Sequence, residues 1–392
     1  MIDIEKIRAE TPGIEFSTHL LACGSSLMPK NVVDAITQHT QLEALMGGYE
    51  AEAKKTDELN NIYDIVAEHI GANSHEIALM ENSTVAWSHA FYALPLNSGS
   101  KILTSEAEYA ANYVAFLQRA KRDNLIIDIV PSDESGTLDV NALESMVDEE
   151  EVGLIAISWI PTNGGLVNPA ERVGQIAKKY NIPYLLDACQ AAGQMSIDVE
   201  KIGCDFLSAT GRKFLRGPRG TGFLYIKDKW LSTIEPVMID HFGAPWVSKN
   251  AYELREDARR FETWENSYAL RIGLGEAITY AEEIGIDFIH ERVQLLASLN
   301  RKLLSEVKNV QVRDIGTEQC GIISFSIEEE KDPKKIVDQM SEAGFTIGSV
   351  DPESTLIDSV KRNLPTLLRM APHYYNTEEE IEKAVKQISL LL

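Results

Sequence analysis

The sequence predicts an α/β protein with a mainly parallel sheet in a large domain and a smaller α+β domain at the C-terminal end. Two observations predict this fold. Short apolar runs rich in β-branched residues alternate with helical patterns from about residue 70 to about residue 230, as in parallel strands joined by crossover helices. After residue 273 a long helical stretch is followed by a different mixture of strands and helices, so we expect a second structural unit there.

Apolar runs predict strands at residues 76–80, 100–105, 126–130, 152–160, 182–187 and 205–208. Between them, residues 85–93, 111–122 and 169–180 have the apolar spacing of helices. Asn168-Pro169 precedes the last of these helices, and proline is favoured in the first helical turn. Strands and helices therefore alternate through this part of the chain.

The pattern of the C-terminal part predicts a long helical region from after Gly273 to about Val307, a strand at 321–326 and a helix opened by Asp332-Pro333. Strand-like segments follow near Phe345 and Leu367, and Thr377 with Glu380 forms a capping box for the last helix. We expect three units: an N-terminal segment, 1–30, that contributes to the active site and the small domain; a large domain, 31–272; and a small domain, 273–392.

Composition narrows the range of partners. The chain has 392 residues, 44% of them hydrophobic, and a formal net charge of −23, which disfavours nucleic acid and anionic membranes as partners. The longest apolar run, 152–160, is far shorter than the roughly 20 residues that span a bilayer. The first residues show no secretory signal pattern, and we expect a cytoplasmic protein.

The four cysteines, Cys23, Cys189, Cys204 and Cys320, form no CxxC pair and no His/Cys spacing typical of a metal site. We expect no metal. In a reducing cytoplasm they are expected to be free thiols, buried as small apolar residues.

Lys213 and Asp187 are the most informative pair in the sequence. Asp187 ends the predicted strand 182–187, and Lys213 lies in a glycine-rich segment after the strand 205–208. Ligands of open α/β sheets bind at the carboxyl ends of strands. A lysine can form a Schiff base and an aspartate can pair with a pyridinium nitrogen, so the pair predicts a site for pyridoxal 5'-phosphate (PLP).

Other polar residues are expected around the same site. Ser83 and Thr84 precede a predicted helix, where hydroxyls and free amides can hold a phosphate group. Thr210 adds a hydroxyl and Arg212 a positive charge to this phosphate site.

Asn163 and Gln190 follow two further strands and could both reach a ring hydroxyl of the cofactor. Tyr109 follows the strand 100–105 and could lie against the cofactor ring. Taken singly, each amide could instead be a turn residue, and Tyr109 could be a core aromatic.

In this order, a Ser-Thr turn, an aromatic residue, Asn, Asp-x-x-Gln and Lys resemble the class V aminotransferase family of fold type I PLP enzymes, which contains cysteine desulfurases and selenocysteine lyases. The resemblance implies a seven-stranded, mainly parallel sheet and a homodimer with shared active sites. It implies that Lys213 forms the Schiff base, Asp187 pairs with the ring nitrogen and Tyr109 stacks on the ring. Arg369 in LLRMAPHYYNT matches the family arginine that binds the α-carboxylate of an amino acid substrate.

Three departures from the cysteine desulfurases lead to a narrower expectation. Residues 344–368 contain no cysteine where those enzymes keep a nucleophilic one; Tyr109 and Arg212 stand where they have histidines; and Glu265 stands where they have a threonine that reaches the neighbouring subunit. The motifs ACGSSLMP, GGYEAE, PTNGGLVNP and GPRGTGFLY most resemble the branch with hercynylcysteine sulfoxide lyases and isopenicillin N epimerase-like proteins.

These features favour a PLP-dependent carbon-sulfur β-lyase that converts a cysteine S-conjugate or sulfoxide to pyruvate and ammonia without a persulfide cysteine. An aminotransferase or an amino-acid epimerase is the alternative enzyme, and a PLP-binding regulatory protein is the alternative outside enzymes. All four possibilities share the same cofactor and the same lysine.

Overall fold

The larger of the two main sheets has seven strands and lies in the middle of the chain. The computed structural model describes residues 3–149, 151–328 and 332–392. The strands are β2 (Ile77–Met80), β3 (Lys101–Ser105), β4 (Ile126–Val130), β5 (Val152–Ser158), β6 (Tyr184–Asp187), β7 (Phe206–Thr210) and β8 (Gly222–Ile226), in the order β2-β8-β7-β6-β5-β3-β4. Pairing is parallel from β7 through β6, β5 and β3 to β4, and β8 is antiparallel to both of its neighbours. The predicted α/β fold with a mainly parallel sheet is confirmed.

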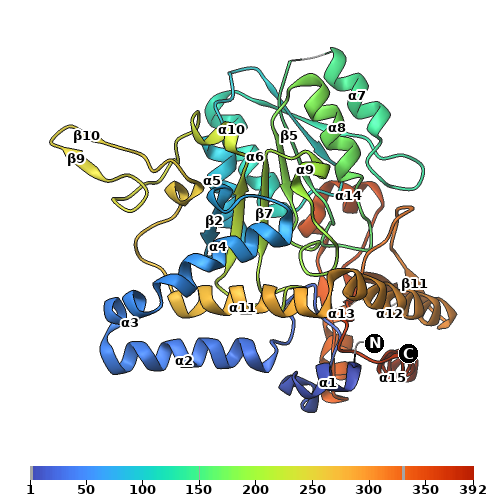
Figure 1. The fold of residues 1–392 in the computed structure, drawn as a ribbon. Coiled ribbons are helices and arrows are strands. Elements are labelled where there is room, and N and C mark those ends of the chain that lie inside the picture. The colour runs from blue at the N-terminus through green and yellow to red at the C-terminus, as the bar shows by residue number, and fades with distance from the viewer. Residues whose placement is uncertain (1–2, 150, 329–331) are drawn as a thin grey trace.

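Helices cover both faces of this sheet (Figure 1). They are α5 (Ser83–Ala93), α6 (Ala110–Asp123), α7 (Val140–Glu149), α8 (Ala170–Tyr180), α9 (Val199–Ile202) and α10 (Asp228–Leu231). Alternate residues of a strand point to opposite faces, and in β5 Ile155 and Ile157 join one buried cluster whereas Leu154 and Ala156 join another. Burial on both faces explains why this strand is a continuous apolar run in the sequence.

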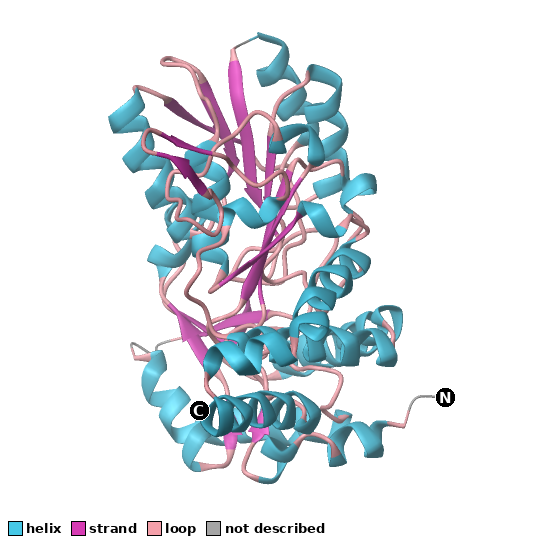
Figure 2. Cartoon of the chain, turned by 60° about the vertical axis from the view of Figure 1, so that its left-hand side comes forward, coloured by secondary structure: helices cyan, strands magenta, loops and turns pink. Residues whose placement is uncertain are grey.

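The C-terminal part forms a second, antiparallel sheet with its own core. Its strands are β11 (Val310–Val312), β12 (Ile323–Ile327), β14 (Gly348–Val350) and β15 (Leu367–Met370), in the order β11-β12-β15-β14. The helices of this part are α12 (Ile286–Glu306), α13 (Pro333–Glu342), α14 (Leu356–Lys361) and α15 (Glu378–Leu391). The predicted capping box of Thr377 and Glu380 opens α15. Figure 2 shows this smaller part below the large sheet.

The long helical region predicted from Gly273 to about Val307 is confirmed, and it consists of two helices. Two helices, α11 (Tyr268–Ile284) and α12, occupy this stretch, and Gly285 between them has φ +92°. Glycine adopts this positive φ without the steric cost that other residues meet, so α11 ends there. The apolar spacing on either side does not reveal the break.

N-terminal elements connect the two parts. The N-terminal helices are α1 (Ile4–Ala9), α2 (Lys30–Met46), α3 (Gly48–Lys54) and α4 (Thr56–Ile70), and α2 lies along α11 in Figure 1. Strand β1 (Thr18–His19) pairs in parallel with β13 (Phe345–Thr346) of the C-terminal part. Short 3-10 turns occur at Pro12–Glu15, Ser74–Glu76, Ala258–Phe261 and Pro352–Thr355. We keep the division into residues 1–30, 31–272 and 273–392 as a proposal. The pairing of β1 with β13 supports the contribution of residues 1–30 to the small domain.

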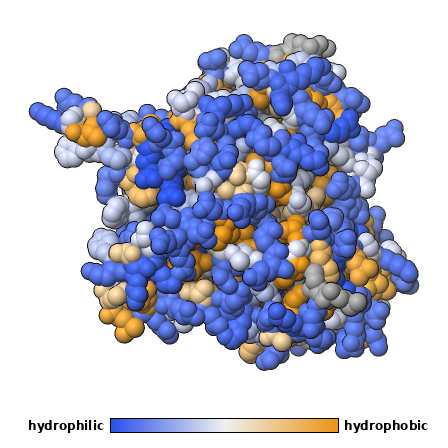
Figure 3. Space-filling view, in the orientation of Figure 1, coloured by the Kyte–Doolittle hydropathy of each residue, from blue (hydrophilic) through white to orange (hydrophobic). Residues whose placement is uncertain are grey.

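A hairpin of β9 (Trp246–Ser248) and β10 (Ala251–Tyr252) projects from the large part. Figure 3 shows a mostly hydrophilic face with apolar atoms on this hairpin and at the end of α2. Trp246 there is 76% exposed and Leu45 at the end of α2 is 85% exposed. Over the described residues, every helix is either too short or too polar to cross a membrane.

We expect Gly193→Ala to destabilise the fold strongly. Gly193 has φ +90°, and a Cβ there would lie 2.3 Å from the backbone N of Leu215. The left-handed backbone costs about 1 kcal/mol and the overlap a further 2 kcal/mol or so. Gly99 is a matched control because it also has φ +90° but nothing within 4 Å of its added Cβ. In urea unfolding, a Gly193→Ala effect no larger than that of Gly99→Ala would contradict the packing.

Candidate active site

Three neighbouring strands deliver polar side chains to one edge of the large sheet. Ser158 ends β5 and is in register with Asp187, which ends β6; Asp187 is in register with Ser208 of β7. Because all three strands are parallel, their carboxyl ends meet at the same edge. Ser158, Asp187 and Ser208 therefore lie at the edge of the sheet where the sequence predicts that a ligand binds.

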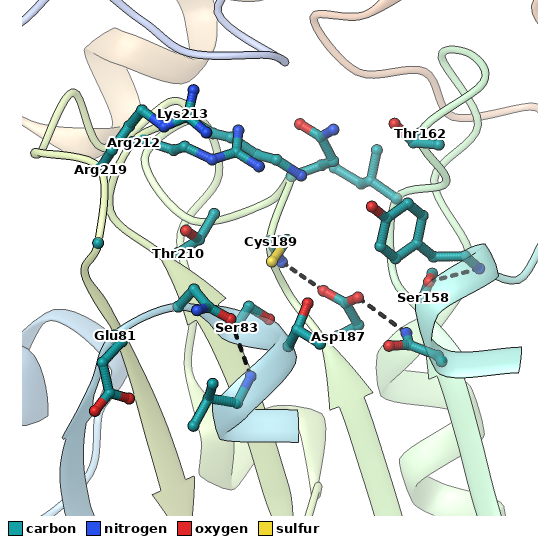
Figure 4. Close-up of a pocket in the computed structure, with 18 residues that line it drawn as sticks. Glu81, Ser83, Ser158, Thr162, Asp187, Cys189, Thr210, Arg212, Lys213 and Arg219 are labelled. Carbon is teal, nitrogen blue, oxygen red and sulfur yellow. Dashed lines mark hydrogen bonds between the residues drawn. The ribbon is translucent and has the colours of Figure 1, made fainter. Parts of the chain in front are cut away.

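A cavity of about 530 Å³ opens at this edge (Figure 4). It contains most of the residues that the sequence predicted for the cofactor, which are Ser83, Thr84, Tyr109, Asp187, Gln190, Thr210, Arg212 and Lys213. Asn163 and Arg369 do not line the cavity themselves. Both lie next to Thr162, which does, since Asn163 follows it in the chain and Arg369 bonds to it.

Lys213 reaches the cavity from the loop after β7. The loop is closed by a hydrogen bond from the Arg216 N–H to the Lys213 carbonyl (3.0 Å), and the buried ring of His373 lies 2.7 Å from the carbonyl of Phe214. Burial lowers the pKa of the Lys213 amine, and the nearby Cys189 and Asp187 act in the opposite direction. A lowered pKa makes the neutral, nucleophilic amine available at lower pH.

Asp187 is 7% exposed and is held from two sides. Its Oδ1 accepts a hydrogen bond from the backbone N–H of Cys189 at 2.9 Å, and its Oδ2 accepts one from Nδ2 of Asn112 at 3.0 Å. Two donors on separate elements fix the plane of the carboxylate. Such a group can pair with a cation in the cavity without first changing its orientation.

The N-terminus of α5 faces the same cavity. The helix begins at Ser83, two residues before the predicted start, and Asn82 caps it by accepting a bond from the Val85 N–H at 3.0 Å. The hydroxyl of Ser83 donates to Ser208 at 3.0 Å. Free N–H groups in the first turn of a helix, together with its dipole, attract anions such as phosphate.

The two other residues predicted for the phosphate already have partners. The Thr210 hydroxyl donates to the carbonyl of Thr221 at 3.2 Å, and the Arg212 guanidinium donates to the carbonyl of Gly24. Both residues line the cavity. Arg212 retains further N–H groups for an anion, because a guanidinium carries five.

The two amide side chains predicted for the ring hydroxyl, Asn163 and Gln190, each have a buried oxygen that lacks a partner among the described residues. Gln190 donates to the carbonyl of Cys23 at 3.2 Å and its Oε1 is unpaired; Asn163 donates to Ser359 at 3.2 Å and its Oδ1 is unpaired. They are 2% and 6% exposed. Leaving a buried acceptor unpaired is costly, so a hydroxyl of a bound group could donate its one proton to either of these oxygens.

Arg369 is oriented by Thr162. Its Nη1 donates to the carbonyl and to Oγ1 of Thr162, each at 2.8 Å, and its buried Nε has no partner among the described residues. Tyr109 is the residue before α6 and is 37% exposed, so it is only partly packed against the protein.

Sequence reasoning missed several residues of the cavity, including Asn112, Ser158, Thr162, Cys189 and Arg219. Cys189 was expected to be a buried apolar thiol like the other three cysteines, but it lines the cavity; all four are free. Its position two residues after Asp187 was the available signal. Burial raises the pKa of the Cys189 thiol to about 12.

These observations fit PLP. The cavity offers a lysine amine, a fixed carboxylate for a ring nitrogen, the unpaired amide oxygen of Gln190 for a ring hydroxyl and a helix N-terminus for a phosphate. Each complements a different part of the same molecule. The fold and the site together define a fold type I PLP-dependent enzyme.

Comparisons with known proteins agree. The model of the aminotransferase class-V family matches residues 18–384, and the chain belongs to that family. A probable cysteine desulfurase from Methanothermobacter thermautotrophicus is 29% identical, with 96% of this chain and 95% of the relative covered. A second, from Pyrococcus abyssi, is 26% identical with the same coverage. The apo structure of a cysteine desulfurase from Thermococcus onnurineus covers 100% of this chain and 98% of its own, with a TM-score of 0.93 and 26% identity.

The comparisons correct one expectation. A carbon-sulfur β-lyase that works without a persulfide cysteine is wrong, because the relatives matched over nearly the whole chain are cysteine desulfurases, which form a persulfide cysteine. The expectation rested on the lack of a cysteine in residues 344–368. One local difference weighs less than similarity along the whole chain.

Proposed function

We propose that this PLP-dependent enzyme is a cysteine desulfurase, which removes the sulfur of L-cysteine and releases alanine. The observation that supports it best is the cavity in which a lysine, a fixed carboxylate and a thiol meet: Lys213, Asp187 and Cys189. The names of the full-length relatives support the substrate.

We propose a role for each side chain. Lys213 holds PLP covalently and, once the substrate amine displaces it, moves the proton at the substrate Cα. Asp187 keeps the ring nitrogen protonated, and Tyr109 covers the ring. When bound, PLP supplies an electron sink for the electrons left by that proton.

The remaining contacts hold the cofactor and the substrate. We propose that Asn163 and Gln190 face the ring hydroxyl, which donates its one proton to the unpaired oxygen of one of them. The phosphate is assigned to Ser83, Thr84, Thr210 and Arg212. Arg369 binds the α-carboxylate of the substrate, and its bonds to Thr162 support this role because they hold the guanidinium beside a residue that lines the cavity.

Cys189 is the thiol that we propose takes the sulfur. Of the four cysteines, all of them described, it is the one that lines the cavity. The Cβ–Sγ bond of the substrate breaks, an S–S bond to Cys189 forms, and the proton that Cys189 gives up ends on Cβ, so alanine and a protein persulfide result. Because its pKa is raised to about 12, the thiol needs a base, and Lys213 lies in the same cavity.

Product analysis with L-cysteine tests the proposal. The holoenzyme with a thiol reductant is expected to form alanine and sulfide in equal amounts. Pyruvate in place of alanine would rule out desulfuration. Cys189→Ala should retain PLP and lose alanine formation; normal alanine formation in that variant would leave the reaction standing and remove Cys189 from it.

Arg369→Ala is expected to raise KM for L-cysteine by about 10- to 100-fold, since a hydrogen bond to a charged group contributes about 1.5–3 kcal/mol. PLP retention should change little because the substrate, and not the cofactor, loses a contact. Arg313→Ala is the control: Arg313 is in the same small sheet region and bonds Ser326. Equal loss of cofactor and substrate affinity in Arg369→Ala would contradict the assignment.

The wider expectations remain proposals. We propose a homodimer with shared active sites in the cytoplasm, and the exposed Trp246 and Leu45 support an interface on that side of the molecule. Glu265, on an exposed stretch beside Trp264, would then lie near the partner. A light-scattering measurement that gives the mass of one chain would contradict the dimer.

The placement in the hercynylcysteine sulfoxide lyase and isopenicillin N epimerase-like branch rests on the sequence motifs alone.

A further inference from the structure

A buried carboxylate, Glu108, lies behind the cavity and has no role in the proposed function. It precedes Tyr109 in the chain and is 3% exposed. It does not line the cavity, so it cannot touch the substrate or the cofactor directly. A buried carboxylate needs several hydrogen bonds to offset the loss of water.

Glu108 accepts five hydrogen bonds. Its Oε1 accepts from the Ser158 hydroxyl (2.7 Å), from Nδ2 of Asn112 (2.8 Å) and from the Tyr109 N–H (3.0 Å). Its Oε2 accepts from the Ser158 N–H (2.8 Å) and from the Thr104 hydroxyl (3.1 Å). Both oxygens are therefore surrounded by donors, which suits an ionised carboxylate.

Asn112 connects Glu108 to Asp187. One amide nitrogen, Nδ2, donates to Oε1 of Glu108 at 2.8 Å and to Oδ2 of Asp187 at 3.0 Å. If the amide turned over, its oxygen would face two carboxylate oxygens with no proton between them. Glu108 and Asp187 together therefore fix the Asn112 amide with its NH₂ group between them.

We propose that Glu108 is a positioning residue that holds Asp187, through Asn112, and Tyr109, through its backbone N–H, in the arrangement that keeps the ring nitrogen of PLP protonated. The inference rests on the proposed role of Asp187. One carboxylate thus sets two of the groups assigned to the cofactor ring.

Glu108 also contributes charge. Burial raises the pKa of Glu108, whereas the hydrogen bonds from Ser158 and Asn112 lower it, and Asp187 nearby raises it. Two carboxylates that share one amide favour a cation beside them. A protonated ring nitrogen paired with Asp187 is such a cation, so Glu108 raises its proton affinity.

The test is the protonation of the ring nitrogen, measured by NMR on holoenzyme loaded with 15N-labelled PLP. In Glu108→Gln the ratio of protonated to neutral nitrogen at a given pH is expected to fall at least tenfold, which lowers the titration midpoint by about one unit. Glu76→Gln is the control, because Glu76 is also 3% exposed and accepts three N–H bonds from Asn73 and Asp228. In the Glu76→Gln holoenzyme, the ring nitrogen of PLP should titrate as in the wild type.

Asn112→Leu provides a second route if Glu108→Gln does not fold. Leucine is close to asparagine in size but donates no hydrogen bond to Glu108 or Asp187, so the same shift is expected. An unchanged titration in the folded variant would overturn the inference. Asp187→Asn distinguishes the role of Glu108 from that of Asp187. If Asp187→Asn shifts the titration midpoint of the ring nitrogen and the other variants do not, only the role of Glu108 fails. If Asp187→Asn has no effect either, the role of Asp187 fails as well.

Discussion

Lys213→Ala is expected to lower kcat/KM for L-cysteine by a factor on the order of 10³ or more and to remove the covalent link to PLP. The lysine has two tasks in the proposed function, holding the cofactor and moving the proton at Cα, and a positioned acid-base group alone contributes about 10² to 10⁴. The visible absorption of PLP added to the variant should be that of the free aldehyde. If the variant instead showed the absorption band of the wild-type enzyme, another amine would have formed the covalent link in place of Lys213.

Lys227→Ala is the control for this experiment. Lys227 follows β8 in the same sheet and pairs with Glu200 outside the cavity. Its loss should leave both the absorption and the rate unchanged. A Lys213→Ala enzyme with the wild-type band and rate would show that the covalent anchor is elsewhere.

Asp187→Asn is expected to lower kcat by a factor of about 10³ while most of the PLP stays bound. The change retains the size of the side chain but removes the charge that pairs with the ring nitrogen, and electrostatic stabilisation of this kind is often a large part of catalysis. Rapid-mixing measurements distinguish an effect on substrate binding from an effect on turnover. We expect the rate of turnover to fall and substrate binding to change little.

Asp205→Asn makes the matched control for Asp187→Asn. Asp205 is 5% exposed, lies just before β7 and bonds the Tyr184 N–H, so it has similar burial at the other end of the same strands. It should affect stability without a specific loss of turnover. If both variants lose turnover to the same extent, the effect of Asp187 is structural.

The strands that deliver the site were predictable because they are buried on both faces. The runs 182–187 and 205–208 end within two residues of the observed ends of β6 and β7. The antiparallel β8 was not predicted, since Gly222–Ile226 has an apolar pattern that carries no direction. Strand order comes from pairing, which the pattern of a single strand does not contain.

The outer part of the site was harder to predict. Glu108 and Asn112 lie four residues apart at the start of α6, and Ser158 meets Glu108 because β5 lies beside β3, the strand that precedes Glu108 in the chain. Hydrogen bonds between segments that are 50 residues apart leave no local signal. Cys189 did have a local signal in the sequence, because it lies between Asp187 and Gln190. Free cysteines are usually buried core residues, however, and this signal was outweighed.

The function was the part on which sequence reasoning failed. The lack of a cysteine in residues 344–368 led to a lyase without a persulfide, yet the chain matches cysteine desulfurases over nearly all of its length. A thiol can enter a site from a different segment, and Cys189 does so from the end of β6. Absence at one position is weak evidence about chemistry that other positions can supply.

A single turnover with L-cysteine, in the absence of a reductant, tests the central claim most directly. The holoenzyme is mixed with one equivalent of L-cysteine per site, and the amino acid product and the cysteine-containing peptides are measured together by mass spectrometry. We predict one alanine per site and the mass of one added sulfur on the peptide that contains Cys189. Pyruvate, with all four cysteines unmodified, would contradict the proposal.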